Sequence, residues 1–104
     1  MITQQQAEQL VYERINAPWP HWSDKPEMIV VHTDERPSGF VVYWTSRPWH
    51  ETRDIRYAIA GNGPYLVCRI DGTLFETGTA APIEDRIREA EHRMQAHLQA
   101  VGAR

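Results

Sequence analysis

The first fifteen residues carry apolar side chains at helical spacing. Thr3 is followed three residues later by Gln6, the pattern of a capping box, in which each side chain bonds the other residue's backbone N–H. Asn16 is a suitable helix stop, and Pro18 cannot continue a helix. We therefore predict a helix over residues 3–15, whose buried stripe consists of Ala7, Leu10, Val11 and Ile15.

The middle of the chain alternates between β-branched or aromatic runs and turn residues, a pattern that predicts five strands. Between the strands, residues 34–39 and 46–54 are polar and contain proline, so both are predicted to be turns or loops. Asp71-Gly72 favours a tight two-residue hairpin. The predicted strands cover residues 28–33, residues 40–45, the alternating Ile55, Tyr57 and Ile59, residues 65–70 and residues 73–76.

Two further segments complete the chain. Residues 17–26 contain three prolines and two tryptophans, which predicts an irregular segment held against the body by Trp19 or Trp22. Pro82 suits the first turn of a helix, and the acidic residues after it favour a helix N-terminus. An apolar stripe that follows predicts a helix over residues 82–100.

The order of these elements predicts the fold class. A helix, then a block of strands, then a helix is typical of an α+β domain. We expect one domain over residues 1–104, with a single antiparallel sheet of four to five strands. The N-terminal and C-terminal helices are both expected to pack on one face of that sheet.

Residues 61–64, Gly-Asn-Gly-Pro, allow two interpretations. A glycine-rich loop can hold a phosphate, but a dinucleotide fingerprint needs a third glycine where this chain has Leu66, and a helix where it has a strand. We therefore favour a tight turn between strands. In that turn Gly61 or Gly63 takes a positive φ, and Asn62 binds no ligand.

Composition and charge narrow the range of partners. The 104 residues carry 14 acidic and 11 basic side chains, a net charge of -3, and no basic block, so nucleic acid is not an expected partner. No apolar run is long enough to span a membrane, and no secretory signal is visible. A single cysteine, Cys68, cannot form an internal disulfide. We expect a cytoplasmic protein that binds neither nucleic acid nor membrane.

The titratable residues form no recognisable catalytic or metal-binding pattern. His50-Glu51 is followed by Asp54 at the position where a zinc protease helix carries its second histidine. Cys68 lies inside a predicted strand, which is typical of a small buried hydrophobe, whereas a catalytic thiol prefers a helix N-terminus or an electropositive cleft. We therefore expect no cofactor, no metal and no catalysis.

The strongest candidate for a binding surface is the predicted loop over residues 46–54. A tryptophan among charged residues in a loop resembles an interface anchor with a polar rim. The alternative, in which Trp49 folds back to cap the sheet edge, stays open. The segment around Trp22 is expected to pack onto the sheet, but it remains a second candidate. The candidate partner-binding residues are Arg47, Trp49, His50, Glu51, Asp54 and Trp22.

Several segments resemble one known family. They are Gly39-Phe40-Val41-Val42-Tyr43-Trp44, the run Tyr57-Ala58-Ile59-Ala60-Gly61-Asn62-Gly63-Pro64, the Asp71-Gly72 turn and Gly78-Thr79-Ala80. Together with the N-terminal helix, they make nearly the whole chain similar to the immunity protein 35 family. That family consists of small α+β proteins predicted to neutralise toxins in bacterial polymorphic-toxin systems.

The resemblance implies a non-catalytic cytoplasmic protein whose partner is a cognate toxin, bound directly. It assigns no functional residue, and it leaves open whether the protein forms a homodimer. Two other functions remain as alternatives. One is a stress-related or housekeeping, chaperone-like module that binds protein chains without any toxin. The other is an enzyme that uses Cys68 or a histidine.

Overall fold

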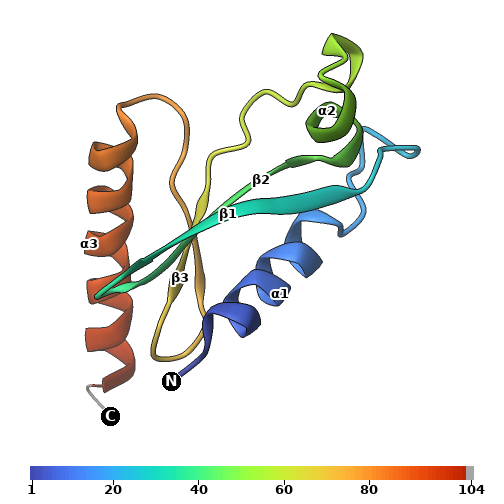
Figure 1. Ribbon diagram of the computed structural model, residues 1–104. Coiled ribbons are helices and arrows are strands. Elements are labelled where there is room, and N and C mark those ends of the chain that lie inside the picture. The colour runs from blue at the N-terminus through green and yellow to red at the C-terminus, as the bar shows by residue number, and fades with distance from the viewer. Residues whose placement is uncertain (103–104) are drawn as a thin grey trace.

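The computed structural model describes residues 1–102. Four strands form one sheet in which their spatial order follows their order along the chain, and every neighbouring pair is antiparallel. The predicted α+β class and the single antiparallel sheet are therefore confirmed. In chain order, the elements are α1 (Gln4–Ile15), β1 (Met28–Arg36), β2 (Gly39–Ser46), α2 (Arg47–Thr52), the 3-10 helix η1 (Ile55–Tyr57), β3 (Tyr65–Cys68), β4 (Leu74–Glu76) and α3 (Ile83–Gly102) (Figure 1).

Both ends of α1 are held by side chains, as the sequence predicts. Thr3 Oγ1 accepts the backbone N–H of Gln6 at 3.1 Å, and Gln6 Oε1 accepts the backbone N–H of Thr3 at 2.8 Å. At the other end, Asn16 Nδ2 donates to the Tyr12 carbonyl at 3.0 Å and to the Met28 carbonyl at 2.9 Å. The backbone N–H of Met28 donates back to Asn16 Oδ1 at 2.8 Å. Asn16 therefore ties the end of α1 to the start of β1.

The two central strands, β2 and β3, are apolar on both faces. Along β2, Phe40, Val42 and Trp44 belong to the core cluster of α1, whereas Val41 belongs to the core cluster of α3. Along β3, Val67 and Leu66 divide in the same way. The α1 side is completed by Ala7, Val11 and Ile15, and the α3 side by Ile87, Ala90 and Met94.

The two long helices therefore cover opposite faces of the sheet, and our prediction that both pack on one face is wrong (Figure 1). The order of elements along a chain does not determine which face each helix covers. The central strands are apolar on both faces, and such a sheet needs a cover on each face. Without α3, Val41, Leu66 and Cys68 would face water.

The predicted third strand, at Ile55, Tyr57 and Ile59, does not form. Ser46 Oγ accepts the backbone N–H of Trp49 at 3.2 Å and caps α2, where we predicted an irregular loop. Asp54 Oδ1 then accepts the backbone N–H of Arg56 at 3.0 Å and starts η1. Local caps of this kind compete with strand pairing for the same backbone groups. The segment consequently stays outside the four-stranded sheet.

The turn at residues 61–64 is held by hydrogen bonds to β2. Gly61 has a φ of 79°, as predicted for one of its two glycines. Trp44 Nε1 donates to the Gly63 carbonyl at 3.0 Å, and Asn62 Nδ2 donates to the Trp44 carbonyl at 2.9 Å. A Cβ atom on Gly63 would lie 2.2 Å from the carbonyl oxygen of Gly78. Close backbone approach therefore requires the second glycine of this turn.

The β3–β4 hairpin closes through a longer loop than the predicted two-residue turn. The backbone N–H of Cys68 donates to the Thr73 carbonyl, and the N–H of Gly72 donates to the Cys68 carbonyl, both at 2.9 Å. Asp71 Oδ1 accepts the backbone N–H of Thr73 at 3.0 Å. Asp71 and Gly72 thus lie in the turn, but the aspartate side chain stabilises a wider loop.

Candidate functional site

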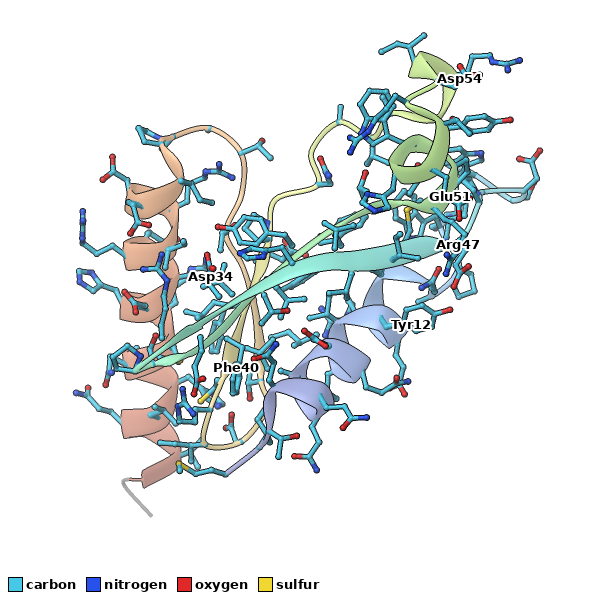
Figure 2. The ribbon with its side chains drawn as sticks, in the orientation of Figure 1. Tyr12, Asp34, Phe40, Arg47, Glu51 and Asp54 are labelled. Atoms are coloured by element: carbon cyan, nitrogen blue, oxygen red, sulfur yellow. The ribbon has the colours of Figure 1, made fainter. Side chains whose placement is uncertain are left out.

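Residues 46–57 form a projection at one end of the sheet, which we name the α2–η1 tip. Figure 1 shows α2 at the end of β2, away from α3. Figure 2 shows Asp54 at the outer part of the tip and Arg47 nearer the sheet. The tip carries five of the six candidate binding residues. The sixth, Trp22, lies in the segment over residues 17–27, which reaches the same end of the sheet through a bond between the Arg47 N–H and the Glu27 carbonyl.

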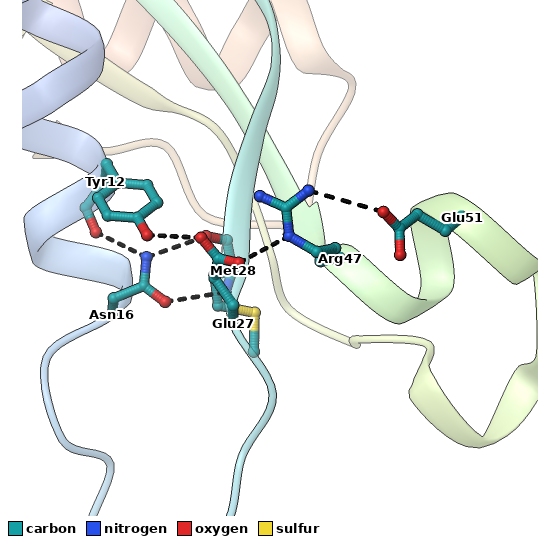
Figure 3. Close-up of polar contacts among 6 residues, drawn as sticks. All are labelled: Tyr12, Asn16, Glu27, Met28, Arg47 and Glu51. Atoms are coloured by element: carbon teal, nitrogen blue, oxygen red, sulfur yellow. Dashed lines mark hydrogen bonds and ion pairs between the residues drawn. The ribbon is translucent and has the colours of Figure 1, made fainter.

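Arg47 anchors the base of the tip. Its Nε lies 2.6 Å from Glu27 Oε1, and Tyr12 Oη donates to the same carboxylate at 2.5 Å (Figure 3). Glu51, one helical turn further along α2, lies 3.6 Å from the Arg47 guanidinium. The hydrogen bonds from Arg47 and then from Tyr12 lower the pKa of Glu27. This network, which we name the Glu27 network, joins α1, the residue before β1 and α2 at the base of the tip.

Trp49 lies on the opposite side of α2 from this network. At about 100° per residue, its direction differs from those of Arg47 and Glu51 by roughly 160°. The side chain is half-buried and belongs to neither of the two core clusters. The structure thus brings Arg47 and Glu51 together but places Trp49 apart from them.

Arg53 ends α2 in the left-handed conformation, with a φ of 59°. Its guanidinium carbon lies 5.4 Å from the centroid of the Trp49 ring, within the range of a cation–π contact. The residue is exposed. Within residues 1–102, no carboxylate lies at ion-pair distance from its guanidinium. Arg53 was not among the candidates that the sequence suggested.

Asp54 is paired inside the tip. Its Oδ2 lies 2.6 Å from Nη2 of Arg56. The hydrogen bonds from the Arg56 side chain and from its backbone N–H lower the pKa of Asp54 to about 2. The carboxylate is therefore ionised at neutral pH, and Arg56 neutralises its charge. His50, on α2, is exposed.

Trp22 packs beside the α1-side core, as the sequence favours. Its ring lies edge-on to that of Trp19, with centroids 6.0 Å apart, and Trp19 in turn lies edge-on to Trp44 at 6.3 Å. The ammonium of Lys25 lies 5.0 Å from the Trp19 ring centroid. The irregular segment is therefore held to β2 by its tryptophans, and Trp22 is half-buried in that contact.

Ile55, which we predicted to lie in the third strand, is an exposed apolar residue of the tip. Its side chain is 78% exposed, at the start of η1. Two local signals point to this outcome. Ser46 precedes Trp49, whose N–H it accepts, by three residues, which is the spacing of a helix N-cap. Asp54 precedes Arg56, whose N–H it accepts, by two residues, which is the spacing of an Asx turn.

Two of the side chains that could serve catalysis, Cys68 and His97, are buried or paired. Cys68 is fully buried in the α3-side core. His97 Nε2 lies 2.7 Å from Asp71 Oδ2 and 3.3 Å from Thr73 Oγ1. Both contacts are therefore made by the same ring nitrogen, Nε2. In a catalytic triad the two ring nitrogens have separate partners, one the nucleophile and the other the acid. The hydrogen bond from His97, and then that from the Thr73 N–H, hold the pKa of Asp71 well below its usual range.

The fold and the tip together define a class of protein. It is a small α+β domain with both sheet faces covered and an aromatic and arginine-rich projection at one end. Across residues 1–102, no three His, Cys, Asp or Glu side chains gather as a metal-binding group. In the same stretch, no helix combines the length and the apolarity needed to cross a bilayer.

The chain belongs to the immunity protein 35 family, whose sequence profile matches residues 11–90. The match includes the whole sheet and the α2–η1 tip, and it confirms the family that the sequence resembles. The chain is also similar to YrhB, an uncharacterized protein of Escherichia coli strain K12. The two are 29% identical over 69 residues, which make up 66% of this chain and 72% of YrhB. No solved structure matches the chain.

Proposed function

We propose that this protein neutralises a bacterial toxin domain by binding it directly in the cytoplasm, without catalysing a reaction. Membership of the immunity protein 35 family carries the proposal. An inhibitor of this kind acts through binding energy alone. It therefore needs a few exposed anchors and charges that complement its target.

The α2–η1 tip is the surface that we propose for the toxin. It carries the exposed Ile55 and the half-buried Trp49 beside arginines, and tryptophan and arginine are frequent energetic hot spots of protein interfaces. Trp49 and Ile55 belong to neither core cluster, so a partner that covers them leaves the core packing intact. His50 and Asp54 supply polar groups at the rim.

Three candidate residues have supporting positions in this proposal. Arg47 and Glu51 hold α2 in place through the Glu27 network. Trp22 extends the surface at the same end of the sheet, where it packs on Trp19. Arg47 and Glu51 affect toxin binding mainly by keeping the tip in one orientation.

Co-expression tests the proposal directly. Each toxin domain encoded beside the gene for this protein is induced in a bacterial host, with and without the protein. We expect one of these domains to arrest growth alone and to permit growth when the protein is present. Calorimetry with that domain, purified after an inactivating change in its active site, then gives the affinity and the stoichiometry.

Failure of every neighbouring toxin domain to be neutralised or bound contradicts the proposal. A chemically unfolded reporter protein serves as the control ligand. Binding of that reporter in place of the toxin domains favours the chaperone-like alternative. Sedimentation of the free protein and of the complex determines whether the binding species is a monomer or a homodimer.

A further inference from the structure

Arg53 occupies a backbone position that favours glycine. The left-handed region crowds the Cβ atom of an ordinary residue, and helices commonly end on a glycine there. Within residues 1–102, every other residue with a positive φ is a glycine. The chain therefore uses glycine wherever else the backbone takes this conformation, and it places a long charged side chain only at the end of α2.

The internal contacts of Arg53 do not account for that choice. Its guanidinium stacks on Trp49 in an exposed setting, and such a contact stabilises a protein by an amount comparable to the cost of a left-handed arginine. The two effects oppose each other, so the side chain brings little net stability. Non-glycine residues in strained conformations cluster at functional sites.

Of the three arginines of the tip, Arg53 is the one whose charge is not paired with a carboxylate of the described chain. Arg47 and Arg56 each have a carboxylate oxygen at 2.6 Å. Within the described chain, Arg53 has no carboxylate at that range. Its planar guanidinium keeps donors free for a carboxylate of another molecule, while its flat face lies against Trp49.

We infer that Arg53 is a specificity-determining contact, and that the partner surface is an apolar recess bordered by an Asp or Glu side chain. Trp49 and Ile55 fill the recess, and Arg53 pairs with the carboxylate. The inference rests on the proposed function, since it describes the toxin surface that meets the α2–η1 tip. The pair sets both the charge complementarity and the orientation of the complex.

Two substitutions at one position and one control test this inference. Arg53→Gly removes the side chain and suits the backbone, whereas Arg53→Lys keeps the charge and loses the planar fork. Arg88→Gln removes the same charge from α3, where Arg88 is exposed and lies 3.2 Å from Asp85. The probe is the inactivated neighbouring toxin domain, titrated at two salt concentrations, and the melting temperature of each variant is measured alone.

We expect Arg53→Gly to weaken binding about tenfold or more and to reduce its salt dependence, because a charge pair is lost. Its melting temperature should be unchanged or a few degrees higher. Arg53→Lys should bind with an intermediate affinity, and Arg88→Gln should bind within about twofold of the unaltered protein, since only non-specific charge is lost.

The outcomes separate this inference from the proposed function. If the unaltered protein binds the toxin domain and Arg53→Gly binds equally well, the inference is overturned and the proposed function stands. A melting temperature lowered by several degrees in Arg53→Gly also overturns it, because the side chain then has a structural role. If the unaltered protein binds no neighbouring toxin domain, the proposed function itself fails.

Discussion

Three arginines of the α2–η1 tip have the same side chain but different environments. Arg47 and Arg56 each lie 2.6 Å from a carboxylate oxygen, whereas Arg53 lies over an aromatic ring. A guanidinium that is already paired has less to gain from a partner than one that is not. The environment of each residue therefore matters more for binding than its type.

Replacing Trp49 by alanine tests the anchor that we propose. We expect toxin binding to weaken by roughly 2 kcal/mol or more, with a nearly unchanged melting temperature, because Trp49 belongs to neither core cluster. Trp22→Ala is the matched control, and it should lower the melting temperature since Trp22 packs against the α1-side core. If Trp49→Ala melts earlier and loses binding only as it unfolds, then Trp49 caps the fold.

The two glycines of the 61–64 turn should respond differently to alanine. Gly63→Ala brings a Cβ to 2.2 Å from the Gly78 carbonyl oxygen, so the backbone must shift, at a cost of about 1–3 kcal/mol of unfolding free energy. Gly61→Ala has open space but a φ of 79°, and it should cost about 1 kcal/mol. Urea unfolding of both variants measures the difference. A larger loss for Gly61→Ala would contradict the role assigned to close backbone approach.

At the scale of elements, α2 is too short to persist on its own. A helix of six residues is marginal in water, so it depends on its caps and on tertiary contacts. Ser46 caps its start, Arg53 ends it, and the carboxylate of Glu27 binds Arg47 in its first turn. The Glu27 network is therefore expected to control the order of the tip more than the stability of the whole chain.

Glu27→Gln should speed amide hydrogen exchange in α2 near neutral pH, while α1 stays protected. The pKa of Glu27 is lowered from 4.5, chiefly by the hydrogen bond from Arg47. The stabilisation that ionised Glu27 gives to the tip is therefore complete above pH 4.5 and is lost as the pH falls below that value. Glu13→Gln is the control, because the hydrogen bond that Glu13 accepts from Gln9 lies within α1. Unchanged exchange in α2 would show that its caps suffice.

At the scale of the whole molecule, two core clusters share one thin sheet. The molecule measures 47 × 26 × 26 Å, and the α2–η1 tip and α3 lie toward different ends of the view in Figure 1. A partner at the tip can therefore leave the outer face of α3 uncovered. Because β2 and β3 contribute side chains to both clusters, loss of either helix exposes one apolar face of the strands that also carry the other cluster.

Met94→Ala tests this shared core. Met94 is 1% exposed between α3 and the sheet, and the substitution should cost about 2–4 kcal/mol of unfolding free energy. Unfolding by denaturant should stay a single transition, since both clusters depend on β2 and β3. Met1→Ala, at a residue 88% exposed, should change stability by less than about 0.5 kcal/mol. Two separate transitions in Met94→Ala would show that α3 docks independently.

The sequence predicted the candidate site in part. It located the segment that carries Trp49, because a tryptophan among charges between strands is unusual in a solvated loop. It missed Ile55, since the alternation after Asp54 has the period of a strand. Arg53 lies inside the predicted loop but was not among the candidate residues. Hydrogen bonds that backbone N–H groups donate to the Ser46 and Asp54 side chains favour α2 and η1 over that strand, and strand propensity does not include such bonds.

The sequence by itself determined the features that depend on neighbours along the chain. The capping box of α1, a positive φ at one glycine of the 61–64 turn and the apolar runs of β2 and β3 follow from short stretches of residues, and the family membership follows from residues 11–90. Only the tertiary structure decided which sheet face each helix covers and which arginine of the tip has no carboxylate partner among residues 1–102. These outcomes depend on contacts between segments that are distant in the sequence. There, the burial of apolar area outweighs the secondary-structure propensity of single residues, and a carboxylate that is paired with one arginine is not available to another.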